Sequence, residues 1–468
     1  MSTTPMTTRR RSAEGGARRW NLTVVLAVLL PLVTLGASLL VRPGETVARR
    51  LEPAVAPLDR ADRVCPTALR GGGSFAVASS QGRSAGQVEL RATTGNGEPT
   101  QLDLPSGGAA SGTSAGPVVV TGRDAVAPGL LATRFGADRL AAVTCPPPVP
   151  ETWFTGLGAR AEHASLLELV NPDVGAAVVD VAVFTRQGSL SVPDLRGIRI
   201  PGRTTTRLDL ATVVPRRGDI ALAVSVSRGR AVATVLDRVG LISSEQPSQE
   251  WFPAQAAPAA QVVLLGLPAG TGARTLSIAN PGDSEVRVQI KVVAPESVFA
   301  PTGLDEVDLG PGGLETVQLD EVLAREVRRG AVGLLVEASA PVTASLTSYV
   351  DGDLAVTGPG PAISGKGAAI VPEGSARVVL AQASGSGTAT VVSRDAAGRE
   401  LGTETVEVTP GRAFVVDLPR GAAVVALLVE RATLEASVVV SGRSGAVVLP
   451  FTAPQLVGQV PDVAPALP

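Results

Sequence analysis

Few residues in this chain are of types that could carry imidazole or thiol chemistry. Among 468 residues there are two cysteines, Cys65 and Cys145, and one histidine, His163. Catalysis through imidazole would have to use His163, which stands in "RAEHASLL" directly before an apolar segment. Because such catalysis needs a nucleophile or base positioned within hydrogen-bond reach, we expect His163 to be a surface or strand-edge residue without a catalytic role.

The two cysteines have three conceivable uses. A structural zinc site usually takes four Cys or His ligands, and two cysteines with one histidine are too few. A redox pair is typically spaced Cys-x-x-Cys, and that spacing does not occur here. In an oxidising compartment the two thiols would pair with each other. We therefore predict a structural disulfide between Cys65 and Cys145, which closes a loop of about 80 residues and contributes roughly 4 to 5 kcal/mol at most.

Carboxylates and aromatic rings offer two further chemistries. Asp305 and Asp308 in "LDEVDLG" could act as paired acids in glycoside processing, which requires two carboxyls roughly 5 to 10 Å apart. We interpret them as residues of a solvated strand face. Trp153 in "ETWF" and Trp251 in "QEWF" could form a glycan-binding platform, but their matching positions favour packing between repeated units. No catalytic, cofactor-binding or metal-binding residue is assigned from the sequence, and no cofactor is expected.

The N-terminal segment predicts where the chain is located. Five arginines lie within residues 1–20, and an uncharged apolar stretch follows at 21–41. As a helix, this stretch would be about 30 Å long, enough to cross a bilayer. The arginines favour a cytoplasmic N-terminus, which would leave the bulk of the chain outside the cytoplasm. The alternative is a secreted protein released by signal cleavage near "GAS" at 36–38.

The net charge of the chain indicates which kinds of partner it could bind. The formal net charge is −2, and the basic residues of the N-terminal segment leave the remainder more acidic than that. An acidic surface is unsuited to a polyanion, so nucleic acid is not an expected partner.

An internal repeat organises the rest of the sequence. The stretch "LELVNP" at 167–172 returns as "LSIANP" at 276–281. Pro-Gly pairs then follow at 201–202, 311–312 and 410–411, each before an alternating apolar segment. Self-similarity at a fixed period indicates repeated structural units, so the Asn-Pro motif reads as a turn signal and not as a binding motif.

The strand pattern predicts the fold class. Apolar residues alternate within each unit, as in Val179, Val181 and Val183, which is typical of strands with one buried face. About six such strands per unit favour an all-β protein of tandem antiparallel β-sandwiches with immunoglobulin-like connections. The alternative is a closed, propeller-like ring. The best helix candidate outside the apolar N-terminal stretch is "LDEVLAREVRR" at 319–329, with acids first and bases last.

These signals predict eight segments. In order, they are a cytoplasmic basic tail at 1–20, a transmembrane signal anchor at 21–41, a linker at 42–62, a disulfide-closed β-unit 1 at 63–148, β-unit 2 at 149–245, β-unit 3 at 246–358, β-unit 4 at 359–455 and a flexible tail at 456–468.

With its basic tail, apolar stretch, cysteine pair and recurring "NP", "PG" and "DL" units over 63–455, the chain resembles a family of actinobacterial membrane-anchored envelope proteins that carry a domain of unknown function. The resemblance implies an extracytoplasmic, all-β architecture and carries over no catalytic residue. It also implies an envelope protein as partner, for which a large membrane glycosyltransferase is a candidate.

Repetition without a shared polar constellation predicts a non-enzymatic scaffold or interaction protein of the cell envelope, accessory to glycan or envelope assembly. The alternatives are a glycan-binding module and a carboxylate-based glycoside-processing enzyme.

Overall fold

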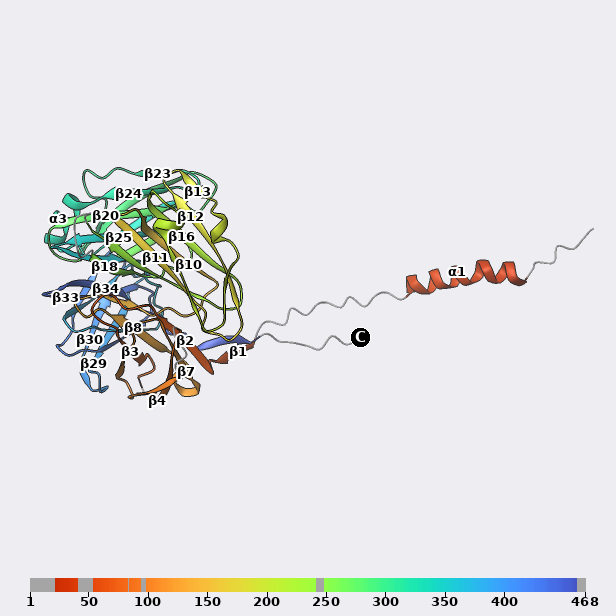
Figure 1. The fold of residues 1–468 in the computed structure, drawn as a ribbon, viewed down its shortest axis with the longest axis horizontal. Coiled ribbons are helices and arrows are strands. Elements are labelled where there is room, and N and C mark those ends of the chain that lie inside the picture. Colours follow the sequence, from red (N-terminus) through yellow and green to blue (C-terminus); the bar gives the residue numbers. More distant parts are fainter. Residues whose placement is uncertain (1–21, 41–53, 83, 94–97, 241–247, 461–468) are drawn as a thin grey trace, which may run out of the picture. The chain divides into compact units, whose positions relative to one another are not determined.

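A computed structural model describes residues 22–40, 54–82, 84–93, 98–240 and 248–460 (Figure 1). The predicted basic tail, residues 42–53 of the predicted linker and residues 461–468 of the predicted C-terminal tail lie outside this part. The chain divides into two compact units, one made of Met1–Ala54 and Gln459–Pro468 and the other of Val55–Gly458. The second unit contains the repeated β-structure.

The apolar N-terminal stretch forms helix α1 (Leu22–Leu40), with Pro31 inside it. Within the described part of the chain, no helix combines the length and the apolar character that a membrane crossing requires. The membrane anchor at 21–41 therefore stays a prediction.

The described β-structure repeats one plan four times, and we name the four copies sandwiches 1 to 4. Sandwich 1 consists of β2 (Arg60–Cys65), β3 (Ser74–Ser79), β4 (Gly86–Ala92), β5 (Thr100–Leu104), β6 (Ala109–Thr113), β7 (Val118–Arg123), β8 (Leu130–Phe135) and β9 (Ala142–Thr144). Sandwich 2 consists of β10 (Glu151–Ala159), β11 (His163–Val170), β12 (Ala177–Thr185), β13 (Gly188–Leu190), β14 (Ile198–Ile200), β15 (Thr205–Asp209), β16 (Arg217–Arg228), β17 (Val232–Val239) and β18 (Ser248–Phe252).

The other two copies follow in chain order. Sandwich 3 consists of β19 (Ala259–Leu265), β20 (Gly272–Ala279), β21 (Val286–Val293), β22 (Val298–Phe299), β23 (Val307–Leu309), β24 (Leu314–Gln318), β25 (Gly333–Val350) and β26 (Asp353–Thr357). Sandwich 4 consists of β27 (Lys366–Ile370), β28 (Ser375–Ala381), β29 (Gly387–Arg394), β30 (Glu400–Val408), β31 (Phe414–Asp417), β32 (Val424–Glu430), β33 (Glu435–Gly442) and β34 (Gly445–Pro450).

Short helices and one outer strand pair complete the described structure. The helices are η1 (Asp124–Val126), η2 (Pro193–Leu195), α2 (Leu210–Val213) and α3 (Asp320–Arg328). The last of these confirms the helix predicted at 319–329. Strands β1 (Ala54–Pro57) and β35 (Val457–Val460) pair with each other and form a separate two-stranded sheet.

The same strand order recurs in every sandwich. In sandwich 1 the two sheets run β2-β7-β4-β5 and β6-β3-β8-β9, and in sandwich 4 they run β27-β32-β29-β30 and β31-β28-β33-β34. Sandwich 2 follows with β10-β16-β12 and β15-β11-β17-β18, with β13 and β14 at the edge of the first sheet. In sandwich 3 the long strand β25 serves both sheets, pairing with β19 and β21 through its first half and with β20 and β26 through its second.

This order corrects the expectation of immunoglobulin-like connections. In an immunoglobulin sandwich the first two strands are neighbours in one sheet. Here the first strand of each sandwich lies beside a late strand, as β2 beside β7, and the second strand belongs to the opposite sheet. In sandwich 2 the first two strands, β10 and β11, share a single residue pair, Ala159 with Ala164.

The propeller alternative is wrong for the described residues. A propeller blade is one four-stranded sheet. Sandwiches 1 and 4 each have two four-stranded sheets, and in sandwiches 2 and 3 the two layers are joined into one continuous sheet through β10–β11 and through β25. In every repeat the two layers enclose an apolar core of their own. The physical reason is the strand alternation, which gives both sheets of a repeat an apolar inner face that only the partner sheet can cover.

The four sandwiches nevertheless form a closed circuit, because each one packs on the next and the fourth packs on the first (Figure 1). An apolar cluster lies at every junction. The cluster between sandwiches 1 and 2 includes Val64, Val119, Val170 and Val232, and the one between sandwiches 2 and 3 includes Trp153, Phe184, Ala279 and Leu314. The cluster between sandwiches 3 and 4 includes Val263, Leu335, Val379 and Val439, and the one between sandwiches 4 and 1 includes Ala76, Leu131, Ala368 and Ile370.

Polar contacts fix the geometry of two of these junctions. Between sandwiches 1 and 2 the buried Glu168 accepts a hydrogen bond from the backbone N of Thr67 at 2.9 Å. Within sandwich 2, Arg207 Nε donates to the same carboxylate at 2.8 Å. Between sandwiches 4 and 1 the backbone N of Ala109 donates to the carbonyl of Ala396 at 3.0 Å. Gly398 is required at this last contact, because its φ is +87° and a Cβ there would lie 2.1 Å from the carbonyl oxygen of Ser106.

The repeated Asn-Pro motif has a structural role in both of its copies. Asn280 is fully buried, its Nδ2 donates to the carbonyls of Ser284 at 2.7 Å and Gly310 at 3.0 Å, and its Oδ1 accepts from the backbone N of Gly282 at 2.9 Å. Asn171 makes the corresponding bonds, to the carbonyls of Gly175 at 2.7 Å and Ile200 at 3.1 Å. Each side chain ties the turn after a core strand to a distant loop, which agrees with the interpretation as a turn signal.

Candidate functional site

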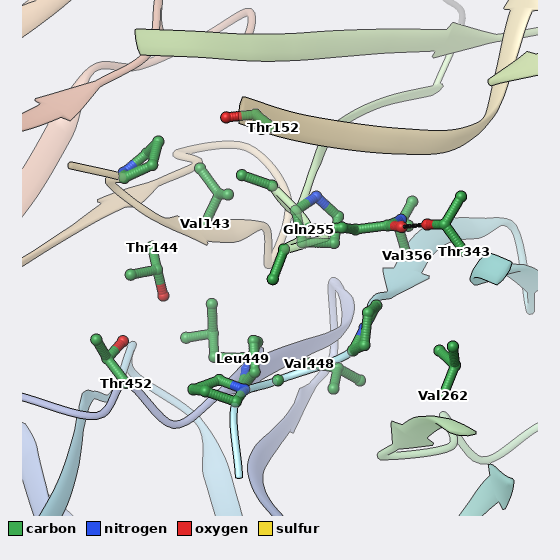
Figure 2. A pocket seen from close by; sticks show the side chains of 18 of the residues that line it. Val143, Thr144, Thr152, Gln255, Val262, Thr343, Val356, Val448, Leu449 and Thr452 are labelled. Atoms are coloured by element: carbon green, nitrogen blue, oxygen red, sulfur yellow. Dashed lines mark hydrogen bonds between the residues drawn. The ribbon is translucent and has the colours of Figure 1, made fainter. Parts of the chain in front are cut away.

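A cavity of ≈ 620 Å³ lies where all four sandwiches meet (Figure 2). Its lining comes from four stretches of chain, within residues 142–152, 250–263, 342–361 and 435–452. Cavities of roughly 300 to 1,000 Å³ with mainly apolar walls are the usual form of a small-molecule site. We therefore take this central cavity as the candidate functional site.

The segments that connect consecutive sandwiches supply much of the wall. They are rich in proline, and the prolines that line the cavity are Pro146, Pro147, Pro253, Pro359, Pro361 and, at the end of β34, Pro450. Proline has no backbone N–H and favours extended chain, so these connections present apolar ring surface and few donors. Further apolar surface comes from Val143 of β9, Val262 of β19, Val356 of β26 and Val448 and Leu449 of β34, and the lining also includes Thr144, Thr152, Thr343 and Thr452 (Figure 2).

Gln255 is the central polar group of the site. It is 3 % exposed, and its Oε1 accepts hydrogen bonds from the hydroxyls of Thr155 at 3.2 Å and of Thr343 (Figure 2). Its backbone pairs with Trp153 in both directions, which fixes the residue against sandwich 2. Its Nε2 has no hydrogen-bond partner among the described residues. Gln255 therefore has a buried donor without a partner beside the cavity, and this atom has no surface open to the cavity.

Burial raises the pKa of two carboxyls in the lining, Glu250 and Glu435. Burial raises the pKa of Glu250 well above its usual value, although the backbone N of Trp251 donates to its Oε1 at 2.9 Å; the carboxylates of Asp353 and Asp237 raise this pKa further. Burial also raises the pKa of Glu435 to about 8. A carboxyl with a raised pKa keeps its proton to higher pH, and in that state it can donate a hydrogen bond. Glu151 is a third carboxyl of the lining and accepts a hydrogen bond from the indole Nε1 of Trp153.

His163 occupies a polar cluster outside the cavity. Its Nε2 lies 2.8 Å from Asp237 Oδ2, and its Nδ1 lies 3.5 Å from Asp219 Oδ1. Ser165 also hydrogen-bonds to Asp237, through the other carboxylate oxygen. The expectation of a surface or edge position is half right, because His163 begins strand β11 but its ring is mostly enclosed. Ser165 is bound to the aspartate and not to the imidazole, so this is not the arrangement of a catalytic triad.

The charge on His163 predicts a pH dependence of stability. Burial lowers its pKa, but Asp237 and Asp219 outweigh burial and raise the pKa to about 10. A raised folded-state pKa means that this stabilisation is complete below pH 6.5 and is lost as pH rises towards 10. We expect the free energy of unfolding to fall by about 3 kcal/mol over that window, measured by urea denaturation at pH 6 and 9.5. His163→Gln should reduce this slope and leave the part that Glu435 contributes, since its raised pKa of about 8 also makes stability fall with rising pH. An equal slope in both proteins would contradict the assignment.

The acidic candidates from the sequence lie on the surface of sandwich 3. Asp305 and Asp308 are exposed, and Asp308 pairs with Arg287 at 3.5 Å with 61 % of its side chain accessible. Neither residue belongs to the central cavity. Across the described ranges, no group of three or more His, Cys, Asp or Glu side chains could hold a metal ion.

Both junction tryptophans are buried. Trp153 packs on Phe184 with ring centroids 5.3 Å apart in the cluster between sandwiches 2 and 3. Trp251 packs on Leu69 and Val143 between sandwiches 1 and 2. This is the arrangement that the packing interpretation predicts, and neither ring forms an exposed platform.

Cys65 and Cys145 form the predicted disulfide, with Cα atoms 4.5 Å apart.

Two serines stand in Gly-x-Ser-x-Gly sequences, at 82–86 and 112–116. In hydrolases this pattern forms the sharp turn between a strand and the helix that follows it. Here the two segments lie between β3 and β4 and between β6 and β7, so they join strands to strands. Ser114 Oγ donates to the carbonyl of Gly116 at 2.9 Å.

Sequence reasoning missed the cavity residues Gln255, Glu250 and Glu435. A faint signal existed in the clustering of prolines at each unit boundary. Glu250 and Gln255 lie at the end of sandwich 2 and Glu435 lies in sandwich 4, so only the assembled circuit shows that they line one cavity.

Two of the solved structures that match this chain are similar to it at low identity. The crystal structure of Streptomyces avermitilis alpha-L-rhamnosidase complexed with L-rhamnose matches at 12 % identity and a TM-score of 0.13, over 87 % of this chain and 57 % of the rhamnosidase. The chain thus spans little more than half of that enzyme. A tetra-tandem repeat in the extending region of a large adhesion protein matches at 12 % identity and a TM-score of 0.10, over 86 % of this chain and 96 % of the repeat.

Comparison of sequences gives a clearer result. No curated protein sequence matches the chain significantly. A family model matches residues 107–419, which is more than half of the chain and runs from sandwich 1 into sandwich 4. The chain therefore belongs to the family of unknown function DUF5719.

Proposed function

We propose that this protein is a non-enzymatic scaffold or interaction protein of the cell envelope that works outside the cytoplasm. The observation that carries the proposal is the closed circuit of four sandwiches, in which apolar clusters seal every junction. A tandem chain of domains with small interfaces would be flexible. Closing the circuit removes that freedom and holds the outer surfaces of all four sandwiches at fixed positions, as a scaffold requires.

Two features support the location. Structural disulfides persist in oxidising compartments, and Cys65 pairs with Cys145. The arginine-rich start followed by an apolar stretch at 21–41 is the sequence pattern of a membrane anchor with a cytoplasmic N-terminus. The partner we propose is another envelope protein, for which a membrane glycosyltransferase is the first candidate to test.

The test is crosslinking in intact cells with the full chain carrying a C-terminal affinity tag. Recovered proteins are identified by mass spectrometry, and each candidate is then tagged in turn to ask whether it recovers this chain. An anchored protein of unrelated fold, expressed to the same level, is the control. We expect one or a few envelope proteins to be enriched in both directions; enrichment equal to the control for every envelope protein would overturn the assembly role.

A further inference from the structure

The wall of the central cavity contains acidic side chains and no basic ones. Its carboxyls belong to Glu151, Glu250 and Glu435, and no Lys, Arg or His side chain belongs to the described lining. A carboxylate that is removed from water is unfavourable unless a cation or hydrogen-bond donors compensate its charge. The partners of each carboxyl therefore show what the cavity lacks.

Two of the three carboxyls have hydrogen-bond donors within the protein. Glu250 is 3 % exposed, and its Oε1 accepts a hydrogen bond from the backbone N of Trp251 at 2.9 Å. Glu151 is exposed and accepts a hydrogen bond from the indole Nε1 of Trp153. Glu435 has no such partner in the part of the chain that the structure describes, neither a hydrogen-bond donor nor a cation.

Glu435 lies on the outer face of sandwich 4, near the start of the cavity wall that strand β33 provides. Its neighbours Ala436 and Val438 lie in the core of sandwich 4, whereas Val439 packs on sandwich 3. Because side chains alternate along a strand, Glu435 projects from the same face as Val439. The residue therefore belongs to the cavity wall and not to the core of its own sandwich.

We propose that the central cavity binds an apolar molecule that carries one ammonium group, of the alkyl amine class, with the ammonium beside the carboxyl of Glu435. This inference goes beyond the proposed scaffold role and does not depend on it. Three observations support it: the largely apolar wall, the absence of a basic side chain from the described lining, and the unpaired carboxyl of Glu435.

The apolar part of the wall matches the alkyl chain of such a ligand. Valines of three sandwiches and a series of prolines line the space (Figure 2). An alkyl chain that enters it loses contact with water in proportion to its apolar area, which is favourable. The volume of ≈ 620 Å³ is typical of sites for small molecules.

The charge of the wall selects an amine over other polar ends. Burial raises the pKa of Glu435 to about 8, and an ammonium beside it would lower that pKa, so the carboxyl would release its proton as the amine binds. The resulting hydrogen bond joins two charged groups and is stronger than one between neutral groups. A carboxylate ligand would find no cation in the described wall, and a hydrocarbon would leave Glu435 unpaired.

The probes are three octyl chains with the same photoreactive diazirine, ending in an amine, a carboxylate or a methyl group. The full chain in nanodiscs of zwitterionic phospholipid is irradiated with each probe at pH 8.5. At this pH Glu435 is largely ionised, and an alkyl amine, with a pKa of about 10, stays protonated. Labelled peptides are mapped by mass spectrometry, with and without an excess of unreactive octylamine.

We expect the amine probe to label peptides within 142–152, 250–263 and 435–452, and octylamine to compete with it. The other two probes should label these peptides about 10-fold less, which corresponds to one charge-assisted hydrogen bond. Equal labelling by the carboxylate or the hydrocarbon probe would overturn the proposal.

Glu435→Gln tests the carboxyl directly, because it keeps the shape of the side chain and removes only its charge. No partner among the described residues is lost, so the variant should fold. The half-saturating concentration of the amine probe should rise about 10-fold. Glu404→Gln removes an exposed carboxyl from β30 of the same sandwich, outside the lining, and should leave it unchanged. An equal effect of the two variants would contradict the role of Glu435.

Strand β19 offers a matched pair of positions that tests the location of the ligand. Ala259 and Ala260 are both exposed, but Ala259 lines the cavity and Ala260 does not. Ala259→Trp should obstruct the cavity and reduce labelling by the amine probe to background, while Ala260→Trp should leave labelling unchanged. Neither position is in a packed core, so both variants should fold. Labelling that persists in Ala259→Trp would show that the amine binds elsewhere.

Discussion

Removing the disulfide by the double substitution Cys65→Ala and Cys145→Ala is expected to lower the free energy of unfolding of sandwich 1 by about 4 kcal/mol. Both sulfurs are fully buried, and they connect opposite sheets, since Cys65 ends β2 and Cys145 follows β9. The closed loop spans a sequence separation of 80, and chain-entropy arguments give a loop of that length roughly 4 to 5 kcal/mol.

The measurement is urea denaturation followed by circular dichroism, with hydrogen exchange to assign the loss to sandwich 1. Reduction of the wild type should reproduce the effect, and reductant should not affect the double variant. Amides of sandwich 3, which does not contact the disulfide cluster, should retain their protection. A difference below about 1 kcal/mol would show that the core holds the two sheets without the covalent link.

The second large effect is expected at Trp251, which joins sandwiches 1 and 2. The side chain is 2 % exposed, packs on Leu69, Ala141 and Val143, and donates from its indole Nε1 to the carbonyl of Thr67 at 2.9 Å. Trp251→Ala removes both the packing and the hydrogen bond. Truncations of buried aromatic residues cost about 3 to 5 kcal/mol, so we expect a loss in that range.

Tyr349 provides the matched control, because it is also an aromatic residue in a strand but is 43 % exposed. Tyr349→Ala should cost less than 1 kcal/mol in the same denaturation measurement. Trp251→Phe should give an intermediate loss, since a smaller ring remains while the bond to Thr67 disappears. If Trp251→Ala costs no more than Tyr349→Ala, the junction between sandwiches 1 and 2 does not contribute to the stability of the circuit.

Much of the fold within a repeat could be predicted from local sequence. The alternation of Val286, Val288 and Ile290 gives β21 one buried face, and these residues are indeed buried while Arg287 and Gln289 are more accessible. The acidic start and basic end of 319–329 gave the helix α3. The disulfide followed from there being two cysteines and an expected oxidising location. All of these depend on neighbours in the chain or on composition.

The order of the strands in each sheet was harder to predict. Alternation shows that a strand has a buried face, but it does not show which strand lies beside it. Sandwiches with immunoglobulin-like order and with the order found here have the same inward and outward residues. The choice depends on hydrogen bonding between distant strands, such as β2 with β7. The sequence did contain one unused signal of packing between sandwiches. The runs "ALAV" at 221–224 and "VVLL" at 262–265 are apolar at every position, which indicates strands that are buried on both faces.

By itself, the sequence determined that this protein is built from repeated antiparallel β-units, that Asn171 and Asn280 set turns, and that Cys65 pairs with Cys145. The tertiary structure alone decided that four sandwiches close into a circuit around a cavity, and that Gln255, Glu250 and Glu435 meet there. The physical reason is that alternation and turns act over a few residues. Circuit closure and the cavity arise from outer faces that are far apart in the sequence, and their burial exists only after the sandwiches pack together.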